Sequence, residues 1–214
     1  MYNFTFNIPT KIHFGKDTIS SLSELKAYGS KVLLVYGGGS IKKNGLYDTA
    51  MKILKDAGLT VFELSGVEPN PKIETVRKGV EICKNEGIDM VLAIGGGSTI
   101  DCSKVVAAGA RYDGDAWDLV LDGSKVKAAL PIFDVLTLSA TGTEMDPFAV
   151  ISDMSKNEKW GTGSPYMVPT MSILNPEYTF SVSKKQTAAG TADMMSHTME
   201  NYFSMENADC QKFM

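Results

Sequence analysis

The chain has 214 residues and a formal net charge of −4, with 43% hydrophobic and 21% charged residues. That length suits one large domain, or one and a half smaller ones, and the apolar content is sufficient for a buried core. The acidic balance argues against a surface for nucleic acid or anionic membrane. No stretch reaches the apolar length of a membrane span, and the alternating N-terminus lacks the continuous apolar run of a signal peptide.

Residues 2–14 alternate between apolar and polar types, which predicts an edge strand or hairpin interrupted at Pro9. Short apolar runs then alternate with segments of helical periodicity. In the helical segment 69–87, Asn70 is the expected N-cap, with Pro71 in the first turn. Strands are expected within residues 31–40, 59–67, 89–98, 133–145 and 170–179, and helices within residues 46–58, 69–87 and 99–110.

This alternation predicts an α/β protein with a doubly wound, mostly parallel sheet, whose ligands bind at the carboxyl ends of the strands. After about residue 184 the pattern changes, because the remaining residues have helical potential without a strand signal. We therefore expect one domain over residues 1–184. Residues 185–214 are expected to form the first helix of an all-helical domain that this chain does not complete.

The three cysteines, Cys83, Cys102 and Cys210, are far apart and odd in number. Two of them fall among apolar residues in stretches with helical character. This usage does not fit a disulfide framework, so we expect reduced thiols in a cytoplasmic protein.

Two of the predicted strands end in the same tetrapeptide, Gly37–Ser40 and Gly95–Ser98. Glycine after a buried strand lets a ligand approach the backbone closely, and the N-terminus of the next helix favours a phosphate. Neither copy fits the G-x-G-x-x-G fingerprint, because the third glycine position holds Lys42 or Ile100. The alternative is a pair of tight turns without a ligand. The second copy is the stronger candidate because hydrogen-bonding side chains crowd the strand end there. These are Ser98, Thr99, Asp101 and Ser103.

A third polar loop, residues 137–144 with the sequence TLSATGTE, follows another predicted strand. Three such loops at one edge of a parallel sheet favour a nucleotide crevice more strongly than any one loop does. The alternative is a set of solvated loops whose hydroxyl groups cap neighbouring backbone.

Asp193 and His197 stand four residues apart in a segment with helical potential. Side chains at that spacing share one face of a helix, about one turn apart. A carboxylate and an imidazole so placed suit half of a metal site, although an ion pair on the helix surface is the commoner arrangement.

Seven motifs occur together and in a fixed order: IPTKIHFGK, YGGGSIKKNGLYD, VEPNP, AIGGGSTIDCSK, LSATGTEM, SILNPEYT and AAGTADMMSHTMENYF. Each motif is weak by itself, but the ordered set is specific and spans nearly the whole chain. Together they resemble the iron-containing (group III) alcohol dehydrogenase family, and in particular its butanol dehydrogenase branch.

The resemblance implies an N-terminal Rossmann-like domain of the dehydroquinate synthase type, an all-helical C-terminal domain and an active site between them. It implies hydride transfer between NAD or NADP and a primary alcohol such as butanol, or its aldehyde, with the help of Fe²⁺ or Zn²⁺. It also implies a homodimer. The implied cofactor-binding residues are Gly37, Gly38, Gly39, Ser40, Asn70, Gly95, Gly96, Gly97, Ser98, Asp101, Thr137, Ser139, Thr141, Thr143, Lys159 and Thr179.

By the same resemblance, the second glycine turn holds the pyrophosphate, Lys159 lies near the nicotinamide and its ribose, and Asn70 lies near the adenosine. Family members that prefer NAD often carry an acidic residue at the position of Gly39. This chain has no carboxylate there, and Lys42 and Lys43 follow. We therefore expect NADP(H) to be accepted and preferred over NAD(H). The alternative is that both lysines are solvated and point away.

Asp193 and His197 match the family's first two metal ligands, and they would take part in catalysis through the metal. The family pattern adds two histidines from later helices, whereas the other histidine of this chain is His13, which we expect to be structural or exposed. We therefore expect the N-terminal portion of a longer enzyme, without a tight metal site and with little dehydrogenase activity of its own.

Two alternatives stay open at this point. One is a non-catalytic nucleotide-binding fragment that needs a missing domain or a partner chain. The other is a different enzyme on the same fold, such as a relative of dehydroquinate synthase or glycerol dehydrogenase.

Overall fold

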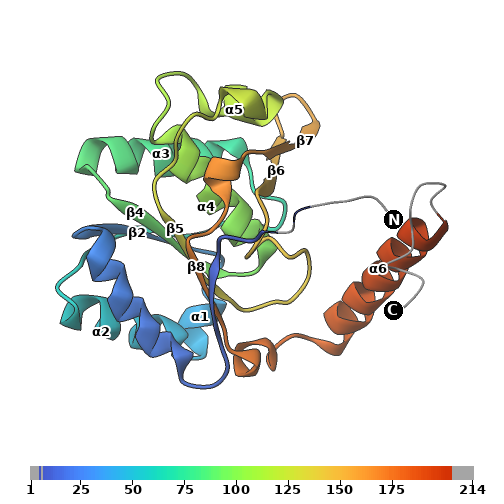
Figure 1. Cartoon of the computed structure of the whole chain (residues 1–214), viewed down its shortest axis with the longest axis horizontal. Helices are drawn as coiled ribbons and strands as arrows, with labels where there is room; N and C mark the ends of the chain where they lie inside the picture. Colours follow the sequence, from blue (N-terminus) through green and yellow to red (C-terminus); the bar gives the residue numbers. More distant parts are fainter. Residues whose placement is uncertain (1–4, 6, 204–214) are drawn as a thin grey trace. The chain divides into compact units, whose positions relative to one another are not determined.

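The computed structural model describes residue 5 and residues 7–203 of the chain. One compact unit comprises Ile8–Thr179, and a second contains the first residues and the segment from Phe180 on. Figure 1 draws both, with helix α6 (Lys184–Phe203) in the second unit. The first unit holds the sheet and both glycine turns.

The first unit is built on a sheet of six parallel strands in the order β1-β8-β5-β4-β2-β3. The bounds are β1 Lys11–Phe14, β2 Lys31–Tyr36, β3 Thr60–Leu64, β4 Met90–Gly95, β5 Ile132–Leu136 and β8 Met171–Leu174. The inner strands β2, β4 and β5 are almost wholly buried because both faces of the sheet are covered. The predicted doubly wound α/β fold is confirmed, and the five strands after β1 in this sheet lie within their expected ranges or one residue outside them.

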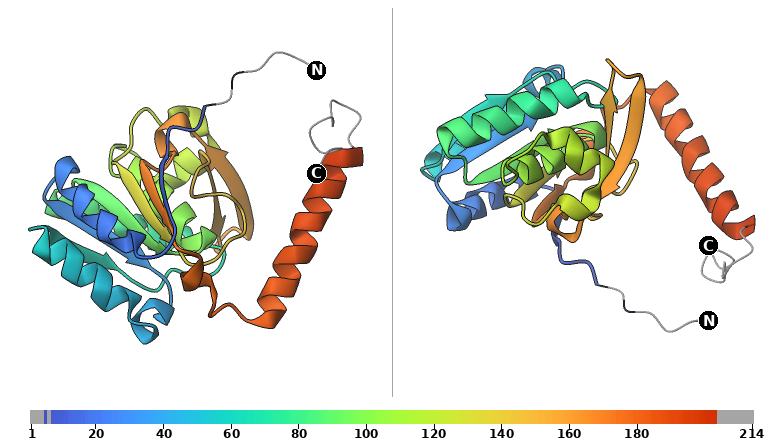
Figure 2. Two further views of the ribbon diagram at one scale, coloured as in Figure 1. Left: turned by 60° about the horizontal axis from the view of Figure 1, so that its bottom comes forward. Right: turned by 90° about the horizontal axis from the view of Figure 1, so that it is seen from above.

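Helices cover the sheet in two layers. The bounds are η1 Thr18–Tyr28, α1 Ser40–Lys43, α2 Leu46–Asp56, α3 Ile73–Glu86, α4 Gly97–Gly109 and α5 Ala116–Leu121, with short 3-10 turns η2 Gly123–Lys125, η3 Pro165–Met167 and η4 Pro176–Thr179. Val32 and Leu34 of β2 face the layer of α1, α2 and η1, whereas Leu33 and Val35 face the layer of α3, α4 and α5. The left panel of Figure 2 looks toward the layer of α2, and the right panel looks toward the layer of α3.

The strand order places a topological switch point between β2 and β4. From β2 the chain passes to the outer strand β3. Helix α3 then leads back across β2 to β4, and β5 and β8 follow on the far side. Ligands of doubly wound sheets bind beyond the carboxyl ends of the strands at such a point. The two glycine turns directly follow β2 and β4, so the fold brings both to this point of the sheet edge.

β1 is an edge strand that pairs in parallel with β8, as one of the two readings of the N-terminal alternation predicts. His13 lies in this strand, with Nδ1 3.1 Å from Ser21 Oγ and Nε2 3.2 Å from Glu24 Oε1. It therefore has a structural role, as expected.

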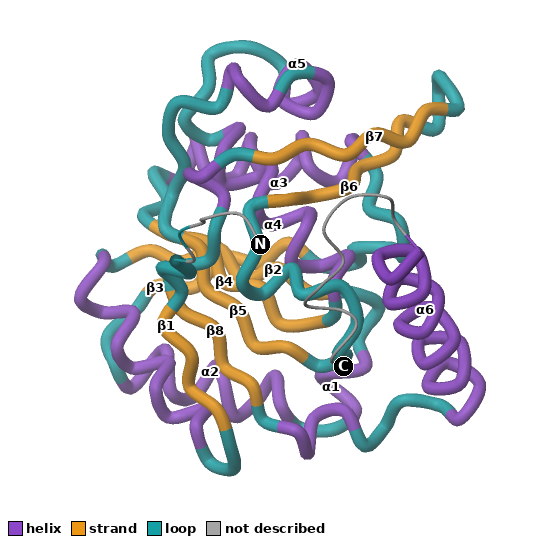
Figure 3. Tube along the Cα trace, turned by 45° about the vertical axis from the view of Figure 1, so that its right-hand side comes forward, coloured by secondary structure: helices purple, strands orange, loops and turns teal. Residues whose placement is uncertain are grey.

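A two-stranded antiparallel hairpin, β6 (Phe148–Asp153) and β7 (Glu158–Gly163), was not among the predicted elements. Figure 3 shows it as a separate pair of strands beside α3 and α4. Ala149 and Ile151 of β6 are buried in the core of that helix layer. Polarity does not follow burial along β6, because the apolar Phe148 and Val150 are exposed while the polar Ser152 and Asp153 are buried.

The prediction that Asn70 is the N-cap of the helical segment 69–87 is wrong. Helix α3 begins at Ile73, and Lys72 is its N-cap. Ser152 N–H donates to Pro71 O at 2.9 Å, and Lys72 forms a bridge with Ser152, so the backbone before α3 is extended rather than helical. Asn70 lies in the left-handed region with φ 55°. A contact with β6, distant in sequence, thus delays the start of the helix.

The helix predicted after residue 184 is present as α6, which begins at Lys184, while the first unit ends at Thr179. A second, all-helical domain stays a prediction. Cys83 and Cys102 are buried free thiols, and burial raises the pKa of each to about 12. Cys210 lies outside the described residues. Within the described part of the chain, no helix is long and apolar enough to cross a membrane.

Candidate functional site

The second glycine turn joins β4 to α4 and is tightly enclosed. A Cβ atom added at Gly95 would lie 2.4 Å from Thr99 Oγ1, and one added at Gly97 would lie 3.2 Å from Thr141 Oγ1. The turn therefore needs glycine for steric reasons, and Gly97 lies against the loop 137–143. The N-terminus of α4, which begins at Gly97, presents backbone N–H groups and the positive end of the helix dipole. This arrangement suits a pyrophosphate.

The first glycine turn, after β2, is more open. A Cβ atom added at Gly38 or Gly39 would meet no atom within 4 Å, and Gly39 has a φ of 101°. Gly37 lies closer to its surroundings, since its added Cβ would be 3.2 Å from Val67 O. An open glycine backbone at the switch point leaves room for part of a dinucleotide to approach.

Lys42, in α1, lies in a small cluster beside the first turn. Its Nζ is 4.4 Å from the ring centroid of Tyr47, 5.0 Å from that of Tyr36 and 4.0 Å from Glu63 Oε2. The Glu63 carboxylate accepts hydrogen bonds from the Tyr36 and Tyr47 hydroxyls at 2.6 and 2.8 Å. The bond from Tyr36 is the main cause that lowers the pKa of Glu63 below its ordinary value. Both lysines expected near the cofactor are exposed, and Lys42 is engaged by these protein groups.

Asn70 links the second glycine turn to the β6–β7 hairpin. Its Oδ1 accepts a hydrogen bond from Lys159 Nζ at 2.7 Å, and its backbone N–H donates to Ser98 Oγ at 3.3 Å. Lys159 and Asn70 are expected near different ends of the dinucleotide. In the structure they meet beside the turn that is expected to hold the pyrophosphate.

Asp101 and Thr143 contact each other where α4 meets the loop 137–143. Thr143 Oγ1 donates to Asp101 Oδ1 at 2.6 Å and accepts from Lys104 Nζ at 2.8 Å, and Asp101 Oδ2 accepts from the Val150 N–H at 2.9 Å. Burial raises the pKa of Asp101, against the opposing effect of the Thr143 hydrogen bond. Burial also lowers the pKa of Lys104, against the opposing effect of Asp146. Both oxygens of Asp101 therefore have protein partners.

A second buried carboxyl, Asp134 of β5, lies near this cluster. Ser172 Oγ is 2.6 Å from Asp134 Oδ2 and 2.7 Å from Glu144 O. A hydroxyl has one hydrogen, so it can donate to only one of these two oxygens. A protonated Asp134 supplies the other hydrogen. In agreement, burial raises the pKa of Asp134 well above its ordinary value.

A cavity of about 260 Å³ lies beyond the carboxyl ends of β5 and β8. Two of the expected cofactor residues, Ser139 and Thr179, line it. The other lining residues are Phe14, Leu136, Glu144, Leu174, Asn175 and Pro176. An apolar wall with a few polar groups is typical of small-molecule sites.

The fold brings the expected cofactor residues together around the switch point and its neighbouring strand ends. The Thr137 N–H donates to Gly95 O at 2.9 Å, and Ser40 begins α1 after the first turn. All sixteen lie in the first unit, on the turns after β2 and β4, the loops after β3, β5 and β8, the start of α4, or β7. Their roles toward a cofactor stay predictions.

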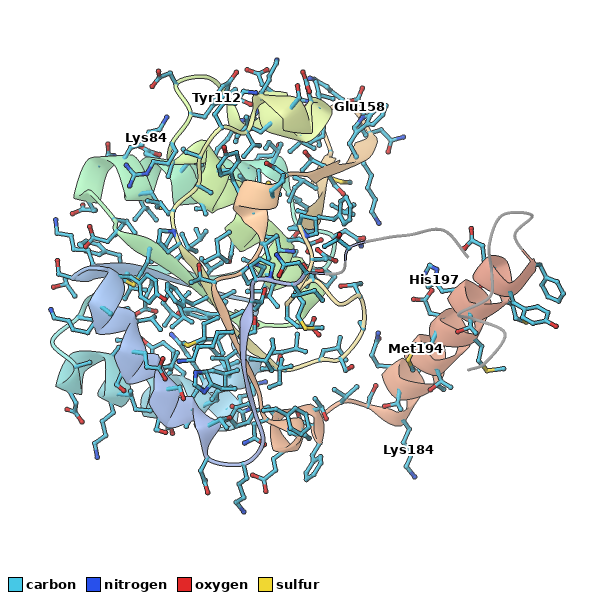
Figure 4. All side chains as sticks on the ribbon, in the orientation of Figure 1. Lys84, Tyr112, Glu158, Lys184, Met194 and His197 are labelled. Atoms are coloured by element: carbon cyan, nitrogen blue, oxygen red, sulfur yellow. The ribbon has the colours of Figure 1, made fainter. Side chains whose placement is uncertain are left out.

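Asp193 and His197 lie on α6, in the second unit, where Figure 4 labels His197. Asp193 Oδ2 is 3.7 Å from His197 Nε2, and these side chains are 70% and 68% exposed. Glu200 Oε2 lies 3.7 Å from His197 Nδ1. A carboxylate and an imidazole are suitable donors for Fe²⁺ or Zn²⁺, so the pair fits as two ligands of such an ion. Among residues 5 and 7–203, no group of three or more His, Cys, Asp or Glu side chains could hold a metal.

The parallel sheet, its switch point and the two glycine turns define a Rossmann-like α/β unit of the kind that binds nucleotides. The chain belongs to the iron-containing alcohol dehydrogenase family, whose model matches residues 9–176. The family resemblance carried by the ordered motifs is confirmed.

Named relatives point to the same branch. NADH-dependent butanol dehydrogenase A of Clostridium acetobutylicum is 62% identical over 205 residues, which cover 95% of this chain and 53% of that protein. The NADPH-dependent aldehyde reductase YqhD of Escherichia coli is 40% identical over 205 residues, covering 94% and 52%. The crystal structure of NADH-dependent butanol dehydrogenase A from Thermotoga maritima matches with a TM-score of 0.90 and 49% identity, covering 95% and 52%. The chain thus spans about half the length of the relatives it matches.

Some residues around the site were not singled out from the sequence. The burial of Lys104 could have been suspected from the sequence, since it is a charged residue inside the apolar stretch of a helix. The cluster of Glu63 with Tyr36 and Tyr47 has no local signal, because its members come from different elements.

Proposed function

We propose that this chain provides the nucleotide-binding part of a metal-dependent, NAD(P)(H)-using alcohol dehydrogenase or aldehyde reductase that acts on primary alcohols such as butanol. One observation carries the proposal: Ser98, Asn70 and Lys159 meet beside the glycine turn of β4, at the switch point. Backbone N–H groups of the turn would hold the pyrophosphate, and the Lys159 ammonium would offset part of its charge. The printed names of relatives, a butanol dehydrogenase and an aldehyde reductase, support this reaction class.

In this proposal the predicted cofactor-binding residues contact different parts of the dinucleotide. The open turn Gly37–Ser40 receives the adenosine side, and the turn Gly95–Ser98 receives the pyrophosphate. The hydroxyls of the loop 137–143, with Thr179 across the cavity, face the remaining part of the cofactor. Asp101 supports the site without contacting the cofactor, since its two oxygens hold Thr143 and Val150 in place.

Binding tests this proposal directly. Isothermal titration of the 214-residue chain with NADH, NADPH and ADP should show saturable binding of all three. The turns after β2 and β4 are complete in the first unit, so no further residues are needed for the pyrophosphate contacts. Absence of heat and of competition up to about 1 mM of each ligand would contradict the proposal, because that limit corresponds to roughly 4 kcal/mol of binding free energy.

Asp193 and His197 are the proposed metal ligands. A bound divalent metal would act as a Lewis acid on the substrate oxygen. Two ligands on one exposed helix leave the other coordination positions to water, so we expect weak binding and little dehydrogenase activity from this chain alone.

Titration with Zn²⁺ should give a dissociation constant weaker than about 10 µM, against the roughly 10–16 kcal/mol of complete structural zinc sites. Asp193→Asn and His197→Gln should abolish this weak binding. Micromolar or tighter binding, or butanal reduction at the rate of a full-length relative, would show that the expectation is wrong.

We propose further that NADP(H) is accepted and preferred. No carboxylate stands in the first glycine turn, and Lys43 is exposed beside the cluster that engages Lys42. The names of relatives include both kinds of enzyme, NADH-dependent and NADPH-dependent.

We also propose that residues 185–214 begin an all-helical, metal-bearing domain after a nucleotide-binding domain of residues 1–184. Met194, Met195 and Met199 on α6 are 51–59% exposed, and apolar side chains in such number are usually covered by further helices. The open edge at β1 supports a homodimer, and the reduced cysteines support a cytoplasmic location. Light scattering of the purified chain would measure its oligomeric state.

A second candidate is a nucleotide-binding fragment without catalysis of its own. The high exposure of Asp193 and His197, 70% and 68%, on a single helix favours it. Nucleotide binding together with undetectable butanal reduction in saturating Fe²⁺ or Zn²⁺ would select it.

A further inference from the structure

Lys104 is a lysine without exposed side-chain surface, two turns into α4. Burying an ammonium is costly unless the group is paired and hydrogen-bonded. Four oxygens lie 2.8 Å from its Nζ: Thr143 Oγ1, Asp146 O, Asp146 Oδ1 and Phe148 O. The Thr143 hydroxyl hydrogen is directed to Asp101, so all four oxygens act as acceptors toward Nζ. An ammonium with three hydrogens serves these acceptors, whereas a neutral amine with two would leave more of them without a partner.

These contacts join α4 to the segment that follows β5. Lys104 and Asp101 belong to α4, Thr143 belongs to the loop 137–143, and Asp146 follows that loop before β6. At the other end of the loop, the Thr137 N–H donates to Gly95 O. The loop 137–143 is thus attached at both ends to the strand–turn–helix that carries the second glycine turn.

The same contacts extend into β6. Its first residue, Phe148, accepts from Lys104 through its carbonyl oxygen, and the Val150 N–H donates to Asp101. The first residue of the hairpin that carries Lys159 is therefore bound by the buried Lys104 ammonium. Lys159 itself lies in β7 and has its own hydrogen bond to Asn70 at 2.7 Å, so loss of Lys104 acts first on the segment after β5.

The position of the loop indicates which half of a dinucleotide it serves. A dinucleotide lies across the switch point, with its two nucleotides over opposite halves of the sheet. The turn Gly37–Ser40 follows β2, on the β3 side, whereas the loop 137–143 follows β5, on the other side of β4. With the adenosine over the first turn, the loop faces the nicotinamide half.

We propose that Lys104 is a positioning residue for the nicotinamide half of the cofactor: its buried ammonium holds the loop 137–143 where its hydroxyls meet that half. This inference rests on the proposed nucleotide-binding function and assigns a role within the same site. Because Lys104 is fully buried, it acts through Thr143 and Asp146, not by contact with the cofactor.

The test compares two ligands on the 214-residue chain. NADH spans both halves of the site, whereas ADP contains only the adenosine and pyrophosphate part. Lys104→Met should weaken NADH binding about tenfold or more, as expected for lost charge-assisted hydrogen bonds, and should change ADP binding less than about twofold. A general loss of structure would weaken both ligands alike.

Two further variants serve as controls for a loss of folding. Asp146→Asn keeps an oxygen for the Phe148 N–H, which Asp146 Oδ1 accepts at 2.8 Å, and removes the charge opposite Lys104. It should give a smaller loss in the same direction. Leu54→Ala, in the opposite helix layer, also destabilises the fold by truncating a fully buried side chain. It should leave the ratio of NADH to ADP affinity unchanged.

The outcomes separate the two claims. If the unsubstituted chain binds neither NADH nor ADP, the proposed function fails, and the positioning role fails with it. If the unsubstituted chain binds both, and Lys104→Met weakens them equally or not at all, only the positioning role is overturned. Where Lys104→Met does not fold, Asp146→Asn decides in the same way: a loss confined to NADH supports the role, and unchanged affinities overturn it.

Discussion

Lys159 Nζ lies 2.7 Å from Asn70 Oδ1, although 89 residues separate the two along the chain. The bond joins the hairpin to the segment before α3, and the Asn70 N–H continues to Ser98 Oγ at the glycine turn. An exposed cation is thereby placed beside a helix N-terminus that already favours an anion. The first prediction follows from this relationship.

Lys159→Met should weaken binding of NADH and NADPH about tenfold, because a charge-assisted contact with the pyrophosphate is lost. Titration calorimetry measures the effect. Lys156→Met is a matched control, since Lys156 lies in the same hairpin, is 53% exposed and is 3.9 Å from Asp153. Equal losses for the two variants would indicate only a general charge effect and would refute the assigned role.

A charge at position 39 tests the nucleotide preference. Gly39→Asp and Gly39→Asn are similar in size and share the same strain at a φ of 101°, so the comparison isolates the carboxylate. We expect Gly39→Asp to bind NADPH about tenfold more weakly than Gly39→Asn does, because of repulsion from the 2′-phosphate, while their NADH affinities stay within about twofold. Equal NADPH affinities for the two variants would show that the 2′-phosphate does not lie at this turn.

The buried Asp134 gives a stability effect with a definite sign. Its pKa is raised in the folded state, so its contribution to stability is complete below the unfolded pKa of about 3.9 and is lost as pH rises toward the folded pKa. Asp134→Asn mimics the protonated acid toward Ser172. The free energy of unfolding of Asp134→Asn should therefore increase relative to that of the unsubstituted chain as pH rises above 4. The increase should be at most about 1.4 kcal/mol per pH unit.

Urea unfolding at several pH values measures this difference. Asp89→Asn is a control of opposite sign, because the Ser30 and Lys31 N–H groups donate to Asp89 and lower its pKa, the Ser30 bond being the larger cause. That variant should lose stability relative to the unsubstituted chain as pH rises from the lowered folded pKa of Asp89 to the unfolded pKa of about 3.9, and the difference should stay constant at higher pH. A pH-independent difference for Asp134→Asn would mean that Asp134 is ionised in the folded protein.

The two glycine turns should differ in their tolerance of alanine. A Cβ at Gly95 would lie 2.4 Å from Thr99 Oγ1 and 2.8 Å from Thr99 Cβ, and the β-branched Thr99 has little rotamer freedom in the first turn of α4. Gly95→Ala should cost about 1–3 kcal/mol of unfolding free energy. Gly38→Ala meets no atom within 4 Å and should stay within about 0.5 kcal/mol. Thermal unfolding of both variants checks this, and similar losses would contradict the geometry.

Much of the fold could be predicted from the sequence because it is encoded locally. Apolar runs such as residues 31–36 and 90–95 are continuous since both faces of a parallel sheet are covered, and the glycines after them mark the strand ends. The candidate site could be predicted in outline for the same reason, as its glycine turns and hydroxyl loop follow directly on strands. The hairpin β6–β7 could not, because polarity does not follow burial along β6: the apolar Phe148 is exposed, whereas the polar Ser152 and Asp153 are buried.

The sequence by itself thus determined the family, the order of the parallel strands and of the helices α2, α3, α4 and α6, and the residue types at the crevice, since these depend on local periodicity and on motifs. Only the tertiary structure decided that Asn70 meets Lys159, that α3 starts at Ile73, and that Lys104 is buried under the loop. Each of these depends on a contact between segments tens of residues apart. The free energy of such a contact comes from packing and hydrogen bonds that no local pattern records.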